Sequence, residues 1–373
     1  MNFKEENRIN SGRRLFYRIH IDLPLLIGIT ILAAMGMGVL YSAGGQDIDL
    51  LNRQMIRLSI AFIVMLLIAQ INPSTLKFWA PWLFAIGLLM LIAVLLFGEI
   101  GKGAQRWLNL GVFRFQPSEL MKIAVPIMTA WYLAEAPLPP RGIRLFVATL
   151  IVMVPTLLIA KQPDLGTSLL IASSGFFVLL LSGLRLKLIL GVITLMAASA
   201  PIFWNYLLHG YQRQRILTFL NPETDPLGSG YHIIQSTIAI GSGGLYGKGW
   251  LNGTQSHLDF LPEQSTDFIF AVFSEEFGFL GILLLLAVYI SVITRGIIIA
   301  VNAQDTFSRL VAGSITLTFF VYVFVNIGMV SGILPVVGVP LPLISYGGTS
   351  MVTLMAAFGI LMSIQTHRKL ISA

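Results

Sequence analysis

The chain has 373 residues, of which 56% are hydrophobic and 11% charged, with a net charge of +7 and a mean hydropathy of +0.82. Soluble domains are about half apolar and about a quarter charged, so this composition excludes a soluble protein and indicates a polytopic membrane protein. We interpret the basic balance as inward-facing loops and contact with membrane lipids, and not as nucleic-acid binding. The absence of cysteine excludes disulfides and thiolate metal sites.

Hydrophobic segments long enough to cross a bilayer follow one another along the chain. A helical crossing needs about 20 apolar residues, and about ten segments come near that length. They lie near residues 23–41, 55–71, 79–97, 119–134, 145–161, 166–184, 188–207, 268–290, 308–328 and 347–365. The first is too long for a signal peptide, so we expect an uncleaved anchor. The predicted fold is an all-α polytopic membrane protein, with residues 1–373 forming a single integral-membrane domain.

Lys and Arg in the short loops predict the orientation. The positive-inside rule puts both basic termini in the cytoplasm, and a long outward (periplasmic) loop then joins helices 7 and 8 at about residues 208–266. The outward side nevertheless holds a surplus of cations, namely Arg53, Arg57, Lys102, Arg106, Arg114, Lys122, Lys161, Arg213, Arg215 and Lys248. An anionic ligand at the outer surface accounts for the whole set, whereas any single member can instead snorkel to lipid headgroups.

Carboxylates gather where the long loop meets the eighth hydrophobic segment. Glu263, Asp267, Glu275 and Glu276 lie within sixteen residues of a chain that is otherwise poor in acids. Ionisable groups in an apolar segment usually face a cavity or a partner and mark function. The alternative for Asp267 is a helix N-cap, because an aspartate before an apolar helix binds free N–H groups.

Several outward motifs carry groups that suit an anionic ligand. Arg106 and Trp107 follow a Gly-rich stretch, and an arginine can fork onto phosphate oxygens, although Trp107 also suits a lipid-interface belt. Asp164 fits either a helix start or a polar cluster with that stretch. The stretch 241–249 lacks residues that a P-loop requires. The proline-rich stretch 332–350 fits either a re-entrant packing loop or a ligand contact.

The motifs occur in the order typical of a known family. Gly103-Ala-Gln-Arg-Trp107, Gln116-Pro-Ser-Glu-Leu120, Gln162-Pro-Asp-Leu-Gly166, Pro262-Glu263 with Thr266-Asp267-Phe268, Asn326, Gly332–Gly338 and Leu343–Ser350 resemble the signature of the SEDS family (shape, elongation, division and sporulation). The resemblance covers nearly the whole chain. Within it, the sequence of Asn326–Ser350 favours the elongation branch of the family over the division branch.

This resemblance implies a peptidoglycan glycosyltransferase of the bacterial inner membrane, with its active site facing the periplasm. Such an enzyme polymerises lipid II, an undecaprenyl-diphosphate-linked disaccharide pentapeptide, during elongation and the maintenance of rod shape. Its expected partners are a class B penicillin-binding protein that acts as transpeptidase, other elongation-complex proteins and membrane lipids. The essential acid of the family corresponds to Asp267 and its loop tryptophan to Trp107.

The expected chemistry is an inverting glycosyl transfer. Asp267 is the candidate general base, and cations would stabilise the leaving diphosphate. The candidate substrate-binding residues are Arg53, Lys102, Arg106, Trp107, Gln116, Lys122, Asp164, Glu263 and Ser345. A divalent cation would assist the leaving group, but no ligand cluster in the sequence identifies one, and no other cofactor is expected.

Two other functions are compatible with the same features. A transporter that flips lipid II would use the same cations, and Glu275 and Glu276 would then couple transport to an ion. A non-catalytic scaffold of the elongation complex explains the hydrophobic segments but not the outward carboxylates and cations.

Overall fold

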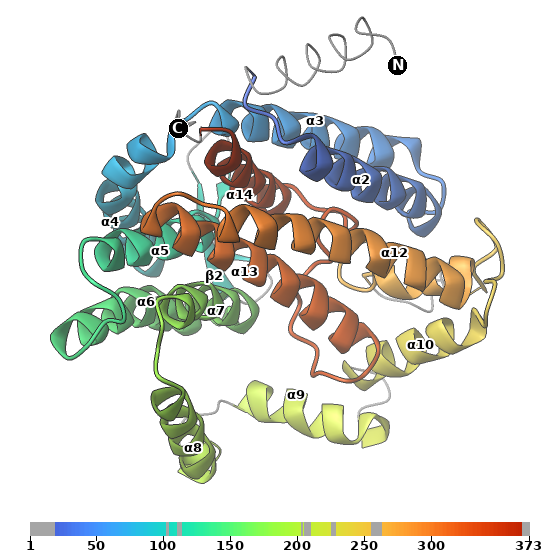
Figure 1. Cartoon of the computed structure of the whole chain (residues 1–373). Helices are drawn as coiled ribbons and strands as arrows, with labels where there is room; N and C mark the ends of the chain where they lie inside the picture. The colour runs from blue at the N-terminus through green and yellow to red at the C-terminus, as the bar shows by residue number, and fades with distance from the viewer. Residues whose placement is uncertain are drawn as a thin grey trace, which may run out of the picture.

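The computed structural model describes residues 19–101, 104–109, 114–202, 204, 210–224, 229–254 and 263–367. These residues are mainly helical (Figure 1). The helices are α2 (Leu23–Ala43), α3 (Ile48–Ala69), α4 (Pro73–Phe97), α5 (Pro117–Ala134), α6 (Ile143–Lys161), α7 (Leu165–Leu181), α8 (Leu186–Ile202), α9 (Gly210–Leu220), η2 (Pro222–Thr224), α10 (Ser229–Ser242), α12 (Ile269–Val301), α13 (Thr306–Val330) and α14 (Thr349–Thr366).

The predicted all-α polytopic membrane fold is confirmed. Among the described helices, seven are long and apolar enough to cross a membrane, namely α2, α3, α4, α6, α12, α13 and α14. The apolar helix α7 is shorter, and α5 carries Glu119 and Lys122 in its first two turns. Each predicted hydrophobic segment falls mainly on one of the helices α2 to α8 or α12 to α14. A total of ten crossings stays a prediction, and the predicted long loop includes α9 and α10.

The helices form layers around α12 and α13. In Figure 1, α2, α3 and α14 lie on one side of these two helices and α5, α6 and α7 on the other, while α8 and α9 project away from the bundle. In the most hydrophobic stretch of each helix, 72% of the α13 residues are buried, but only 17% of those in α3. The outer helices keep large apolar side chains exposed, such as Trp82, Leu89 and Phe97 of α4. A membrane helix can do so because lipid tails are as apolar as leucine.

The interhelical connections gather at the two ends of the bundle. At one end, Arg295 near the end of α12 donates through Nε to Asp22, which caps α2, over 2.9 Å. At the other end, Trp250 donates to the carbonyl of Gly38 near the end of α2 over 3.0 Å. Helices α2 and α12 therefore run in opposite directions, and the sequence-based prediction of sidedness would assign the Asp22 end to the cytoplasm.

Helix α12 is broken in its first half at Gly278. This glycine has φ 61° and ψ −163°, a conformation that residues with a Cβ avoid. The amide of Phe279 donates to the carbonyl of Gly244 over 2.9 Å, and the amide of Leu280 donates to the carbonyl of Leu245 over 3.1 Å. The backbone groups released by the break are therefore paired with the stretch 241–249, which we call the glycine loop.

The glycines of this loop allow its backbone to approach the broken helix. A Cβ on Gly247 would lie 2.1 Å from the carbonyl oxygen of Glu276, and one on Gly243 would lie 2.2 Å from that of Ser274. No side chain fits at such distances. The glycine loop, which lacks the P-loop signature, therefore has a packing role that explains its glycine content.

The segment between α4 and α5, which we predicted to face outward, contains a small antiparallel sheet where the sequence had suggested only a Gly-rich loop. It consists of β1 (Glu99–Gly101), β2 (Ala104–Asn109) and β3 (Arg114–Phe115), in the order β1-β2-β3. Glu99 pairs with Trp107, and Leu108 pairs with Phe115. The sheet fixes the direction of β2, which carries two of the candidate site residues.

Candidate active site

Asp267 lies at the junction between the end of the long loop and α12. The N-cap position of α12 is Phe268, and Phe268 forms no side-chain cap bond; whether Asp267 caps the helix stays a prediction. The carbonyl of Asp267 accepts a hydrogen bond of 2.9 Å from Nδ2 of Asn326, which is fully buried on α13. The same Nδ2 donates to the carbonyl of Val339 over 2.7 Å. Asn326 therefore connects the backbone at Asp267 to the segment that follows α13.

That segment, residues 332–348, is called here the proline segment. Its residue Gly338 has φ 76°, and a Cβ added there would lie 3.4 Å from Oδ2 of Asp267. The Asp267 carboxylate is thus directed at the backbone of the proline segment. Glycine leaves space beside the carboxylate that any other residue would partly fill.

Ser345 binds the proline segment to the residues before Asp267. Its hydroxyl donates to the carbonyl of Thr266 over 2.6 Å and accepts from the amide of Leu341 over 2.7 Å. The amide of Tyr346 donates to the carbonyl of Ser265 over 2.8 Å. Because Ser345 is buried and its hydroxyl is engaged on both sides, these contacts position Asp267.

A buried ion pair lies at the start of α5. Nζ of Lys122 is 2.8 Å from Oε1 of Glu119, and the two side chains are 10% and 6% exposed. The ammonium also lies 5.5 Å from the ring centroid of Tyr322 on α13. Lys122 and Tyr322 line a small pocket of about 40 Å³. A buried cation is tolerated when it is paired, and this one is paired and still borders a cavity.

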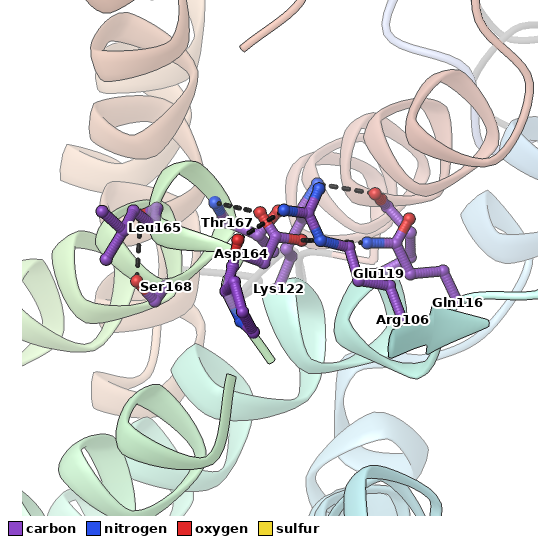
Figure 2. A network of polar contacts seen from close by, with 9 residues as sticks. Arg106, Gln116, Glu119, Lys122, Asp164, Leu165, Thr167 and Ser168 are labelled. Carbon is purple, nitrogen blue, oxygen red and sulfur yellow. Dashed lines mark hydrogen bonds and ion pairs between the residues drawn. The ribbon is translucent and has the colours of Figure 1, made fainter. Parts of the chain in front are cut away.

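A second polar cluster centres on Asp164, the N-cap of α7 (Figure 2). Its Oδ1 accepts from the amide of Thr167 over 3.3 Å, and its Oδ2 accepts from Nε2 of Gln116 over 3.2 Å. Nε of Arg106 lies 3.7 Å from the same Oδ2, and Nη2 of Arg106 donates to the carbonyl of Pro163. Asp164 therefore acts both as a cap and as the centre of a cluster, so the two sequence-based alternatives are combined.

The proline segment connects these clusters. A Cβ on Gly166, in the first turn of α7, would lie 3.0 Å from the carbonyl oxygen of Val337, so α7 begins against this segment. A second small pocket, of about 30 Å³, is lined by Pro340 and Ser345 and shares Tyr322 with the pocket of Lys122. The segment thus borders the Asp267 carboxylate, the start of α7 and a pocket that meets the Lys122 pocket at Tyr322.

The other candidate residues lie less centrally or outside the described chain. Arg53 is exposed on α3 and lies 3.7 Å from Asp47. Glu263 is exposed, with φ 51°, and accepts from Oγ1 of Thr266 over 2.9 Å. Trp107 is half-buried on β2, and Lys102 lies outside the described residues.

The structure adds residues that were not among the candidate substrate-binding residues. The guanidinium of Arg57, one turn after Arg53, lies 4.6 Å above the ring of Tyr346 in the proline segment. Tyr322 joins the two pockets, and Glu119 neutralises Lys122. The spacing of Glu119 and Lys122, three residues apart on a helix, was a local signal of their pairing. Nothing local distinguished Arg57 from Arg53.

His232 of α10 packs beside the start of α12. Its ring stacks on Phe268, with 5.5 Å between the ring centroids. Burial lowers the pKa of the His232 imidazole below its usual value of 6.5, and the Glu263 carboxylate opposes that shift. This aromatic contact attaches α10 next to Asp267.

The remaining carboxylates belong to the break in α12. Oε1 of Glu275 accepts from Nζ of Lys248 over 2.7 Å, and from both the amide and the hydroxyl of Thr254 over 2.9 Å. Oε1 of Glu276 accepts from the hydroxyl of Ser42 and, over 3.2 Å, from the amide of Leu251. Both acids are buried and bind the end of the long loop to α12.

A resident metal has no evident ligand set in the part of the chain that the structure describes. No group of three or more His, Asp or Glu residues is arranged there to hold an ion. We therefore assign no metal ligands.

The chain is similar to known proteins along nearly its whole length. The family model for cell cycle proteins of the FtsW, RodA and SpoVE type matches residues 15–370. Peptidoglycan glycosyltransferase MrdB of Escherichia coli strain K12 is 56% identical over 364 residues, which cover 97% of this chain and 98% of that protein. Peptidoglycan glycosyltransferase RodA of Treponema pallidum is 33% identical, with 93% and 98% of the two chains covered.

Solved structures share the fold. A chain from a study of how a peptidoglycan synthase complex coordinates polymerization and crosslinking has a TM-score of 0.82 at 31% identity, with 93% of this chain and 99% of that chain covered. The rod shape determining protein RodA of Thermus thermophilus has a TM-score of 0.71 at 27% identity, with 93% and 98% covered.

Proposed function

The chain belongs to the SEDS family of FtsW, RodA and SpoVE cell cycle proteins, and we propose that it polymerises lipid II at a site built around Asp267. It is a multi-pass membrane protein and a peptidoglycan glycosyltransferase of the elongation type. The observation that carries the site assignment is the position of Asp267. Its carboxylate is directed at the proline segment, which also borders the start of α7 and lines a pocket that shares Tyr322 with the Lys122 pocket.

In this proposal Asp267 is the general base. Lipid II carries its sugar on a diphosphate through an α-anomeric bond, and the new glycan link is β, so direct inversion requires a base that takes the proton of the acceptor hydroxyl. A positioned carboxylate typically contributes about 10²–10⁴-fold to such a step. The hydrogen bonds of Asn326 and Ser345 hold the backbone around Asp267 and so fix the direction of the carboxylate.

Cations near the proline segment stabilise the leaving diphosphate. Lys122 borders the pocket, Arg106 lies beside Asp164, and Arg57 lies above Tyr346. Charged donors that are already in place when charge develops on the leaving group stabilise the transition state. Arg53 is the weaker candidate because it is exposed and faces Asp47.

The transporter alternative receives no support from the helix break. Ion coupling would require carboxylates that alternate between open and closed sides of the protein. Glu275 and Glu276 are buried and accept hydrogen bonds from Lys248, Ser42 and backbone amides. These contacts suit a fixed joint between loop and helix.

The proposed setting is the bacterial inner membrane, with a single integral-membrane domain, both termini in the cytoplasm and the site facing the periplasm. The chain has no cysteine, so single introduced cysteines report sidedness. Glu223→Cys in η2 should label with an impermeant thiol reagent in spheroplasts, and Asn302→Cys at the end of α12 should not. The reverse labelling pattern contradicts this orientation.

The proposed partner is a class B penicillin-binding protein that supplies the transpeptidase. Its support is the similarity of this chain to one from a peptidoglycan synthase complex. Exposed apolar side chains on the outer helices offer a surface for a membrane-embedded contact. Co-purification of the full chain with the transpeptidase in mild detergent tests the pairing, and failure to co-purify from active membranes contradicts it.

The decisive experiment replaces the base. Asp267→Asn keeps the shape and most hydrogen-bonding capacity of the side chain but cannot accept a proton, so glycan synthesis from lipid II by the purified complex should fall by at least about 10²-fold. Detergent solution removes membrane sidedness, so transport plays no part in the readout. Normal polymerisation by a folded Asp267→Asn complex excludes the general-base role.

The matched control is Asp305→Asn at the opposite end of the bundle. Asp305 is the N-cap of α13, and its side chain accepts from the amide of Ser308 over 2.9 Å. Asn caps a helix about as well as Asp, so this variant should retain its fold and activity. Equal losses in the two variants would indicate a folding defect.

A further inference from the structure

An open pocket lies at the end of the bundle opposite Asp267, between the start of α6 and the turn that joins α7 to α8. Its volume is about 540 Å³. The segment before α6 and the α7–α8 turn form its two walls, and a Cβ on Gly183 would lie 3.4 Å from Cβ of Pro139. Nothing in the glycosyltransferase chemistry uses this pocket, because the proposed site lies at the far end of the same helices.

The rim of the pocket is basic. Arg141 and Arg185 line it from the two opposite walls, and both are exposed. Neither guanidinium forms an ion pair or hydrogen bond with the described residues, in contrast to Lys77 on the same end, which lies 3.0 Å from Glu135. No acidic residue lines this pocket. The arginines therefore present uncompensated positive charge across a shared opening.

Two helix ends reinforce that charge. Helix α6 starts after Gly142, which lines the pocket, and α8 starts directly after Arg185. Gly142 forms no side-chain cap bond, and neither helix has an acidic residue in its first turn. Free N–H groups and the positive end of a helix dipole favour an anion in addition to the arginines.

The rest of the lining is apolar. Phe146 on α6 is 59% exposed and Leu188 on α8 is 47% exposed, and both line the pocket beneath the basic rim. Helices α6 and α8 are apolar, and α6 is long enough to cross a membrane. A ligand that fills this space must combine an anionic group at the rim with hydrocarbon beside the helices.

We propose that this pocket binds an anionic phospholipid of the cytoplasmic leaflet. The phosphodiester lies between Arg141 and Arg185, and the acyl chains follow Phe146 and Leu188 along α6 and α8. Arginine suits this role because its planar guanidinium forms charge-assisted hydrogen bonds with two phosphate oxygens. Basic pockets between membrane helices on the cytoplasmic side are typical of anionic lipid sites. The bound lipid connects α6 to α8, which projects away from the bundle (Figure 1).

The chain offers a matched control for the charge. Arg144 lies three residues after Arg141, Lys187 lies two residues after Arg185, and neither lines the pocket. The variant Arg141→Gln/Arg185→Gln removes the rim charges, and Arg144→Gln/Lys187→Gln removes the same net charge from the same two segments. Monodisperse elution and unchanged glycan synthesis establish that both variants are folded.

The experiment titrates the purified full-length protein in detergent with phosphatidylglycerol and, separately, with phosphatidylcholine, and counts bound lipids by native mass spectrometry. The wild-type protein and the Arg144→Gln/Lys187→Gln variant should hold phosphatidylglycerol in preference to phosphatidylcholine. The Arg141→Gln/Arg185→Gln variant should bind phosphatidylglycerol roughly thirtyfold more weakly, at about a fivefold loss per arginine.

Three outcomes overturn the proposal. Equal weakening in both double variants means that net charge attracts lipid without a specific pocket. Unchanged affinity in Arg141→Gln/Arg185→Gln excludes these arginines as the lipid site. Displacement of phosphatidylglycerol by millimolar inorganic phosphate identifies the pocket as a site for free phosphate, whereas retention of the lipid supports recognition of the headgroup together with its chains.

Discussion

Two Lys–Glu pairs, each with a buried glutamate, differ in their surroundings. Lys122 pairs with Glu119 over 2.8 Å within α5, and Lys122 also borders a cavity beside Tyr322. Lys248 pairs with Glu275 over 2.7 Å between the glycine loop and α12.

The second pair is enclosed by additional bonds. Oε1 of Glu275 also accepts from Thr254, and Nζ of Lys248 donates to the hydroxyl of Thr254 over 2.7 Å. The Lys248–Glu275 pair is therefore part of a joint between two segments, whereas the Lys122–Glu119 pair presents a cation to a cavity. The difference teaches that the space around an ion pair, more than its distance, indicates whether it can meet a ligand.

The largest effect should follow from removing the cation at the cavity. Lys122→Met should lower glycan synthesis by about 10²–10³-fold, because a preorganised charge near the leaving diphosphate is lost. The variant Lys122→Met/Glu119→Gln also removes the buried carboxylate that would otherwise be unpaired, so it separates misfolding from lost chemistry. We expect the double variant to be folded and equally inactive. Recovery of activity in the double variant would contradict a role for Lys122 in catalysis.

The glycine loop allows a test of the joint. Gly247→Ala should destabilise the protein by about 3 kcal/mol or more, because the added Cβ meets the carbonyl of Glu276 at 2.1 Å and the residue has φ 79°. Gly244→Ala is the control, since Gly244 also has positive φ, 56°, but has open space around its Cβ position. That change should cost about 1 kcal/mol. Thermal unfolding in detergent measures both, and equal losses contradict the close backbone approach.

The Lys248–Glu275 pair should affect the free energy of unfolding more than the rate of polymerisation. Glu275→Gln should cost about 2 kcal/mol, because Glu275 is fully buried and loses its charge-assisted bonds. Glu135→Gln, in an exposed pair with Lys77, should cost at most about 1 kcal/mol. The folded fraction of Glu275→Gln should retain polymerisation, measured per folded complex. Complete inactivity of folded Glu275→Gln would contradict a purely structural role and would indicate that Glu275 takes part in catalysis.

The smallest expected effect is a pH dependence of the stability with which α10 packs against the start of α12. Because burial lowers the pKa of His232, the native state binds fewer protons than the unfolded state just below pH 6.5, so this contribution to stability falls as pH falls through 6.5. The protection factors of the α10 amides, which correct the exchange rates for their intrinsic pH dependence, should therefore fall between pH 7.5 and 5.5 in the wild type and fall less in His232→Gln. His20, whose pKa is also lowered by burial, lies at the other end, so His20→Gln should leave the α10 response unchanged.

The sequence by itself determined the membrane class, the positions of the helices and the identity of the motif residues. The membrane helices could be located from the sequence because a bilayer crossing requires only about 20 consecutive, mainly apolar residues. Asp267, Arg106, Gln116 and Asp164 were selected by motif, and the structure joins the last three in one cluster. The chemistry of the family was therefore readable before any contact was known.

Only the tertiary structure decided how those residues meet. Arg57 and not Arg53 lies above Tyr346, because the packing of α3 against α14 sets which turn faces the proline segment. The break at Gly278 is paired by backbone groups more than thirty residues earlier in the chain, which no local pattern reports. Ser345 is buried between two backbone segments that are remote in sequence. Such contacts depend on which segments pack together. The composition of a single helix does not determine its packing partners.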